Sequence, residues 1–278
     1  MWLVPALFAT AVWSVQRVIG KAALRTLSAT QYALLSSALA IPVYLPLLWL
    51  DPPPVRAFPG AIAVSAVSVV AFLITTEALK RGPVGRVSPA LGFAPIPTVL
   101  LAIVFLGESV SPAQAAGVVA AVVALVLLGF RGGDQVPGRA WRGLAVASIL
   151  LQGSAAFLAK VVITPVGPSA LLISSALIQT VVTLALLHHA RAPLPSFGTR
   201  LSRWNAAVLL FAAVATIGYL WALSRGPASI IVPFVAVAPA LGGILGATVL
   251  GERTTASQRV GIAVGVAGTT LLAVGGAG

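Results

Sequence analysis

Long apolar runs alternate along this chain with short stretches rich in proline, glycine and basic residues. An α-helix needs about 20 mostly apolar residues to cross the hydrocarbon core of a bilayer. Ten runs meet this requirement, and we therefore predict an all-α integral membrane protein with ten transmembrane helices. The expected helices span residues 2–20, 29–50, 57–79, 87–106, 112–130, 141–161, 168–188, 204–223, 228–250 and 256–275.

The segments between these runs are short, as in "DPPPV" at 51–55 and "RGGDQVPG" at 131–138. Short connections favour antiparallel packing of consecutive helices. A transmembrane β-barrel is the alternative, but it would show shorter segments in which apolar and polar residues alternate.

Composition supports a membrane environment for the whole chain. Hydrophobic residues make up 59% of the 278 residues and charged residues only 8%, whereas about 25% of a soluble domain is charged. No polar segment is long enough for a soluble domain. The apolar run at the N-terminus lacks a preceding basic stretch, so we expect an uncleaved first helix.

The net charge is +12, with 17 Lys and Arg against 5 Asp and Glu. These basic residues stand singly or in small groups between apolar runs, which is typical of loops that orient a membrane protein. We therefore expect no nucleic-acid partner. The chain contains no cysteine, which excludes disulfides and thiol chemistry.

An internal repeat divides the chain. Residues 78–117 align without a gap on residues 222–261, and 14 of the 40 positions are identical, including an "RGP" triplet, two prolines and an "LGE" triplet. Shared apolar composition does not align proline, glutamate and arginine together. We predict two five-helix halves, residues 1–130 and 141–278, joined by a connecting loop at 131–140 within a single transmembrane domain.

Because five is odd, the two halves must cross the membrane in opposite directions. Inverted repeats of this kind are typical of secondary transporters. The two copies of "ALxRGP", at 78–83 and 222–227, would then lie on opposite faces of the membrane.

The chain resembles the drug/metabolite transporter superfamily, EamA type, over essentially its whole length. The resemblance rests on Trp13 followed eight residues later by Lys21, on the two "ALxRGP" stretches, and on "LGE(S/R)x(S/T)xxQxxG" at 106–117 and 250–261. The second half departs from the pattern, since Gln152 stands where the tryptophan would be. The resemblance implies export of amino acids or related metabolites, with both termini in the cytoplasm.

A pocket formed by the first, third, fourth, sixth, eighth and ninth helices is expected, and the resemblance implies the same set. Its polar and aromatic candidates for substrate binding are Trp13, Gln16, Thr75, Thr76, Glu77, Gln152, Tyr219 and Trp221. One half would present hydroxyl and carboxylate groups and the other aromatic rings, which suits a small amphipathic metabolite or an organic cation.

Pro95 and Pro239 occupy equivalent positions about two turns into the fourth and ninth helices. Each removes a backbone hydrogen bond and kinks its helix, and such breaks are tolerated where the backbone lines a cavity. We predict that both kinks flank the pocket and serve in gating. Packing kinks without a functional role are the alternative.

Three further ionisable groups have competing interpretations. Glu77 is the acidic residue placed inside a span, where a carboxylate is a candidate for proton coupling, but Arg81 four residues later favours a local ion pair. Glu108 is expected to cap the helix that follows it, and ion coupling is the alternative. Lys160, at a helix end, is expected to extend to the membrane surface.

The function predicted is secondary transport of small metabolites across the cytoplasmic membrane by alternating access, in the export direction, by a monomer. A non-transporting scaffold and an uptake facilitator for an organic cation remain alternatives. We expect no enzyme, cofactor or metal site, because the chain has no HExxH or Walker motif. The loops on the basic side hold most of the Lys and Arg residues, which favours both termini outside the cytoplasm, in conflict with the resemblance.

Overall fold

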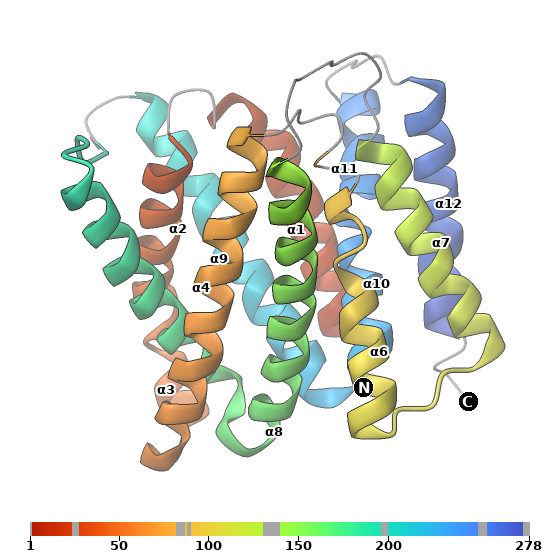
Figure 1. The fold of residues 1–278 in the computed structure, drawn as a ribbon, viewed down its shortest axis with the longest axis horizontal. Helices are drawn as coiled ribbons and strands as arrows, with labels where there is room; N and C mark the ends of the chain where they lie inside the picture. Colours follow the sequence, from red (N-terminus) through yellow and green to blue (C-terminus); the bar gives the residue numbers. More distant parts are fainter. Residues whose placement is uncertain are drawn as a thin grey trace.

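The architecture is a bundle of α-helices (Figure 1). A computed structural model describes residues 2–23, 28–81, 87, 90–129, 140–195, 200–249 and 255–274, and these contain no strand. The elements are α1 (Leu3–Ala23), α2 (Ala29–Tyr44), α3 (Leu47–Leu50), η1 (Val55–Ala57), α4 (Phe58–Arg81), α6 (Pro95–Leu106), α7 (Pro112–Gly129), α8 (Ala140–His189), α9 (Arg200–Arg225), α10 (Ala228–Ala236), α11 (Ala238–Val249) and α12 (Ala256–Val274).

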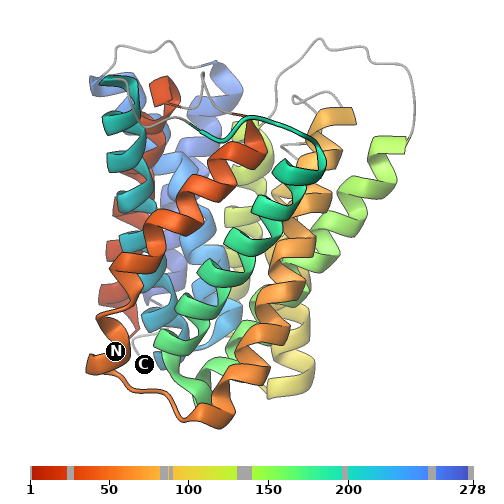
Figure 2. The same cartoon turned by 90° about the vertical axis from the view of Figure 1, so that its left-hand side faces the viewer.

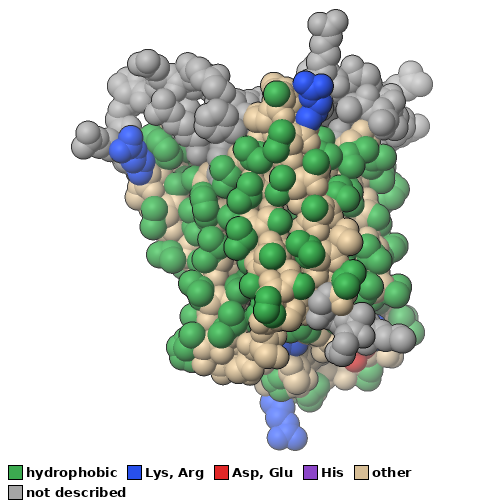
Figure 3. Space-filling view, turned by 90° about the vertical axis from the view of Figure 1, so that its right-hand side faces the viewer, with side chains coloured by type: hydrophobic (Ala, Val, Ile, Leu, Met, Phe, Trp, Pro, Cys, Tyr) green, Lys and Arg blue, Asp and Glu red, His purple; other side chains and the backbone are tan. Residues whose placement is uncertain are grey.

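Helix length and composition indicate a multi-pass membrane protein. Within the described residues, five helical segments are long and apolar enough to cross a bilayer, and they cover residues 30–50, 55–78, 141–189, 206–225 and 256–274. Shorter apolar helices accompany them. Large apolar side chains face outward, for example Trp49 and Val104, which are 89% and 72% exposed. Figure 3 shows hydrophobic side chains over the middle of one face and Lys and Arg side chains toward its two ends.

One long helical element, α8, contains both of the spans expected over 141–161 and 168–188. Helical backbone continues up to residue 166, and the chain reverses at Gly167, whose φ of 78° and ψ of 158° lie outside the helical region. Glycine adopts a positive φ without the steric cost that a Cβ imposes. We call residues 140–166 the first arm of α8 and residues 168–189 its second arm. The second arm lies between α2 and α4 (Figure 2).

Proline interrupts three of the expected helices. The run expected over 29–50 divides into α2 and α3, with Pro46 preceding α3. In the run expected over 87–106, a turn at residues 92–94 precedes α6, which begins at Pro95. The run expected over 228–250 divides into α10 and α11 at Val237, two residues before Pro239. Proline lacks the N–H that would continue each helix and clashes with the preceding turn.

Small residues bring α7 and α12 into close contact. A Cβ at Gly117 would lie 3.0 Å from the carbonyl oxygen of Gly268, and a Cβ at Gly268 would lie 3.1 Å from that of Gly117. Close backbone approach through small residues is a common way to pack helices in lipid. Small side chains on both helices, such as Ala120 opposite Gly268, allow this close approach.

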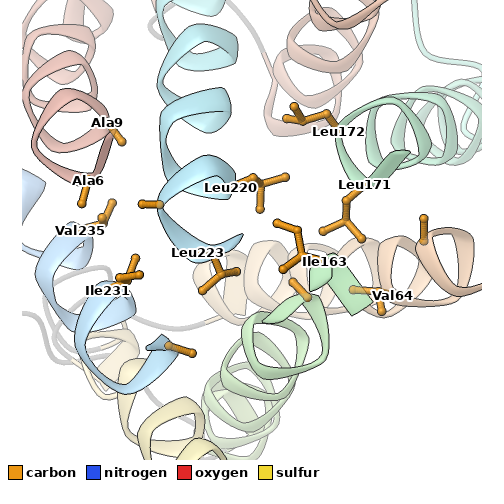
Figure 4. Packing of buried hydrophobic residues seen from close by; sticks show 14 of the residues in the cluster. Ala6, Ala9, Val64, Ile163, Leu171, Leu172, Leu220, Leu223, Ile231 and Val235 are labelled. Carbon is orange, nitrogen blue, oxygen red and sulfur yellow. The ribbon is translucent and has the colours of Figure 1, made fainter. Parts of the chain in front are cut away.

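The ends of the bundle differ. Helix α1 begins and α12 ends at one end, which is the lower end in Figure 1, whereas α1, α4 and α7 all end at the upper end. The largest cluster of buried apolar residues includes Ile163, Leu171, Leu220 and Leu223, which lie close together between α8 and α9 (Figure 4). It continues to α1 and α10, so that a packed core joins the helices.

Candidate functional site: a central cavity

A cavity of about 730 Å³ lies among α1, α2, α6, α7, α8, α9, α10 and α11. Its volume falls within the range of about 300–1,000 Å³ that is typical of small-molecule sites. The polar and aromatic side chains that line it are Trp13, Gln16, Tyr32, Thr98, Gln152 and Tyr219. No lining residue carries a charge among those that the structure describes.

Two aromatic rings form one wall. The rings of Trp13 and Tyr219 lie with their centroids 5.7 Å apart and their planes at 42°, within the range at which aromatic side chains stabilise one another. One turn after Trp13, the side-chain amide of Gln16 donates to the hydroxyl oxygen of Tyr32 at 3.2 Å. The upper part of α1 therefore presents an aromatic ring and an amide side by side.

Gln152 is held in place by hydroxyl groups behind it. Its amide nitrogen donates to the hydroxyl oxygens of Thr75 on α4, at 2.9 Å, and Ser148 on its own helix, at 3.0 Å. Thr75 and Ser148 also hydrogen-bond to each other. Because these contacts occupy the amide nitrogen, the carbonyl oxygen of Gln152 is the atom that can accept a hydrogen bond from a bound molecule.

The break that precedes α6 and the break between α10 and α11 both lie beside this cavity. Ala94 and Pro95 line it at the start of α6, and Ala236 and Pro239 line it where α10 gives way to α11. The hydroxyl of Thr98, one turn into α6, donates to the carbonyl oxygen of Gly153 at 2.8 Å and so fixes α6 against α8. Irregular backbone next to a cavity is the arrangement in which membrane helices tolerate such breaks.

The residues predicted from the sequence fall into two groups. Those that line the cavity are Trp13, Gln16, Pro95, Gln152, Tyr219 and Pro239. Of the others, Thr75 supports Gln152 from behind, Thr76 donates to the carbonyl oxygen of Phe72 on its own helix, and Trp221 packs against the apolar core.

Glu77 is likewise not a lining residue. Its carboxylate accepts from the Nε atom of Arg81 at 2.6 Å, near the end of α4, with 38% of its side chain exposed. This is the local ion pair that the sequence offered as the alternative to proton coupling.

Two polar lining side chains were not predicted. Thr98 lies one turn beyond Pro95 on the same helix face, and this spacing was a usable signal. Tyr32 belongs to α2, a helix that the sequence analysis left outside the pocket. Its contact with Gln16 depends on how α1 and α2 pack, and local sequence pattern does not predict that packing.

At the lower end of the bundle, a set of hydrogen bonds surrounds the turn between α9 and α10. The carboxylate of Glu108 accepts from the backbone N–H groups of Ala228, at 2.9 Å, and Ser229, at 2.8 Å, and from the Ser229 hydroxyl at 2.6 Å. The ammonium group of Lys160 donates to the carbonyl oxygens of Leu223, at 2.8 Å, and Gly226, at 2.7 Å. We call this set of contacts the lower clamp.

The lower clamp corrects two sequence-based expectations. Glu108 does not cap the following helix, because Ser111 and Gln114 form the capping box of α7, and it caps α10 instead. Lys160 does not extend to the surface but binds carbonyl groups at the end of α9. Both partners are distant in sequence, so local pattern could not find them. The side chain of Lys21 and all of Glu252, the equivalent positions in the repeat, lie outside the described residues.

Additional contacts accompany the lower clamp. Trp2 packs edge-on against Phe234, with ring centroids 5.7 Å apart, and its side chain also closes against Gly226. The lining residues of the cavity lie instead toward the upper end, where Tyr32 is near the start of α2 and Leu128 near the end of α7. Among the described residues, no group of three or more His, Cys, Asp or Glu side chains could hold a metal ion.

The fold defines the class as a multi-pass helical membrane protein, with a central cavity among its helices. The sequence profile of the EamA-like transporter family matches residues 1–130 and 140–274, and the chain belongs to this family. A solved crystal structure superposes with a TM-score of 0.80 at 17% sequence identity, covering 98% of this chain and 96% of the other, which shows a shared fold. No curated protein matches the chain.

Proposed function

We propose that this protein is a secondary transporter that moves small amphipathic metabolites, such as amino acids or organic cations, across the cytoplasmic membrane by alternating access, in the export direction. The observation that carries the proposal is a ligand-sized cavity beside two helix breaks, toward the upper end of the bundle. The lower clamp holds the opposite end together. A cavity closed toward one end is what alternating access requires of a resting conformation.

The proposal includes ten membrane crossings arranged as two inverted five-helix halves, 1–130 and 141–278. Three features support it. The family profile matches two stretches that coincide with these halves. The breaks near Pro95 and Pro239 lie at equivalent positions, and α7 and α12, the last helices of each half, pack against each other.

A flux measurement in liposomes tests the proposal against a non-transporting scaffold. Purified protein is first screened with amino acids and organic cations for ligands that raise its unfolding temperature. Proteoliposomes then exchange the best radiolabelled ligand against unlabelled ligand. We expect exchange at least tenfold above empty liposomes; binding without any exchange would favour the scaffold.

Orientation can be tested by reporter fusions. The basic residues favour termini outside the cytoplasm, and in this arrangement the cavity of the present conformation would face the cytoplasm, as an exporter needs when it loads. We therefore expect a C-terminal alkaline phosphatase fusion to be active. A C-terminal fusion to a fluorescent protein that fluoresces only in the cytoplasm should give no signal. The opposite pattern would place the termini inside, as the family resemblance implies.

Glu77→Gln tests whether this carboxylate couples transport to protons. The contact with Arg81 at the exposed end of α4 favours an ion pair, so the variant should lose about 0–1 kcal/mol of stability. The pH dependence of exchange should match that of the parent. A variant that exchanges ligand equally at all pH values, while the parent does not, would assign the coupling role to Glu77.

A further inference from the structure

A second, smaller chamber adjoins the central cavity. It has a volume of about 270 Å³ and lies among α4, both arms of α8 and α9. Gln152, Ala156 and Tyr219 line both spaces. We call the smaller space the side chamber, and these three residues form the boundary through which the two spaces adjoin.

Most of the surface that lines the side chamber is apolar. Val64, Leu171 and Leu220 come from three different helical segments and are buried (Figure 4). Ala155 and Ala159, each 7% exposed, add small side chains from the first arm of α8. No charged residue lines the chamber within the described part of the chain.

Hydroxyl groups in the walls already have acceptors. Those of Ser65, Ser68 and Thr216 donate to the carbonyl oxygens of Ala61, Val64 and Ala212, four residues earlier, at 2.7, 3.0 and 2.8 Å. Ser175 donates to Leu172 at 2.9 Å. These four hydroxyl groups therefore have no free donor, although their oxygens can still accept. With no charged residue among the described lining residues, burying an ionised group in the chamber would be costly.

The two spaces therefore have complementary chemistry. The central cavity provides the amides of Gln16 and Gln152 and the hydroxyl of Tyr32, whereas the side chamber provides apolar surface. The chamber is slightly smaller than the roughly 300 Å³ at which sites for whole drug-sized ligands begin. It suits a substituent, such as a phenyl ring or a short alkyl chain, better than a complete molecule.

We propose that the side chamber is a specificity subsite, which receives the apolar substituent of an amphipathic cargo while the cargo's polar group stays beside Gln16 and Gln152. This inference rests on the proposed function, because it concerns how the transported molecule is selected. On this proposal, side chains of α4, α8 and α9 determine which substituent length is preferred, and Trp13 does not.

The experiment measures how affinity depends on chain length. The probes are straight-chain α-amino acids from alanine to norleucine and n-alkyltrimethylammonium ions from methyl to hexyl, each titrated against the unfolding temperature of the purified protein. Burial of each methylene contributes about 0.8 kcal/mol, so we expect affinity to rise roughly fourfold per added carbon in at least one series.

Ser68→Leu fills the chamber from its edge, where Ser68 is exposed and a larger side chain can be accommodated. We expect the longest probes to lose at least tenfold in affinity and the shortest to stay within twofold. Ala66→Leu is the matched control, because Ala66 is also exposed on α4 but does not line the chamber. It should leave the whole series unchanged.

The outcomes separate the two proposals. If neither series binds the parent protein, both the proposed cargo class and the proposed subsite are wrong. If the probes bind but chain length has no effect, or if Ser68→Leu and Ala66→Leu shift all probes equally, the proposed function stands and the subsite is wrong.

Discussion

Replacing Glu108 with alanine should lower the unfolding free energy by about 2–3 kcal/mol. The carboxylate accepts three hydrogen bonds from Ala228 and Ser229 at the start of α10. A hydrogen bond to a charged group contributes about 1.5–3 kcal/mol, and the three bonds are not additive because they share one carboxylate. Partial exposure of Glu108 keeps the estimate near the lower value.

The same change should weaken closure of the lower end. Without the carboxylate, the N–H groups at the start of α10 lose their acceptor, and the ammonium group of Lys160 still binds the carbonyl groups of the turn between α9 and α10. We therefore expect ligand loaded into proteoliposomes to leak out even when the outside buffer contains no ligand for exchange. The measurement is thermal unfolding of the purified variant, followed by efflux into ligand-free buffer.

Two controls isolate the lower clamp. Ser109→Ala changes the neighbouring exposed residue and should leave stability within about 0.5 kcal/mol of the parent. Ser111→Ala removes the cap of α7 and should cost about 1 kcal/mol without causing leakage. A Glu108→Ala variant that unfolds at the parent temperature would refute the importance of these contacts.

The second large effect is expected for Gly153→Ala. A Cβ at this position would lie 2.6 Å from the Cβ of Pro97 and 2.8 Å from the carbonyl oxygen of Ala94. Neither atom belongs to a flexible side chain, so α6 must move away from α8. Overpacking of this kind costs about 1–3 kcal/mol.

This displacement would occur beside the central cavity. It separates Thr98 from the carbonyl oxygen of Gly153, which it now contacts at 2.8 Å, and shifts the start of α6 at Pro95. We therefore expect both a lower unfolding temperature and at least a tenfold loss of ligand affinity, measured by thermal unfolding with and without ligand.

Gly143→Ala provides the control on the same arm of α8. Nothing lies within 4 Å of its added Cβ, so the better helix propensity of alanine should stabilise the protein by up to about 1 kcal/mol. If Gly153→Ala behaved in the same way, close contact between α6 and α8 would not be required.

The sequence predicted those parts of the structure that depend on local pattern. Apolar run length predicted apolar helices, of which five are long enough to span a bilayer among the described residues, and proline chemistry located the breaks at Pro95 and near Pro239. Positions 13, 16 and 152 were found because polar or aromatic residues are conspicuous within apolar runs.

What the sequence missed depends on contacts between distant segments. Nothing local to Glu108 indicates that its acceptor atoms reach α10, 120 residues later. From the sequence alone, Lys160 is expected to extend to the membrane surface, and only the fold shows that α9 ends beside it. The side chamber is invisible for the same reason, since it exists only where α4, α8 and α9 leave space between them.

Alternating access is the central claim, and the absence of cysteine from the chain allows it to be tested directly. A single cysteine at Val232, which lines the central cavity, is treated with a membrane-impermeant maleimide in right-side-out and in inverted vesicles. Ala222→Cys, at a fully buried position, is the control and should react from neither side. We predict that Val232→Cys is labelled from both sides and that bound ligand slows both reactions. Labelling from one side only, with or without ligand, would contradict alternating access.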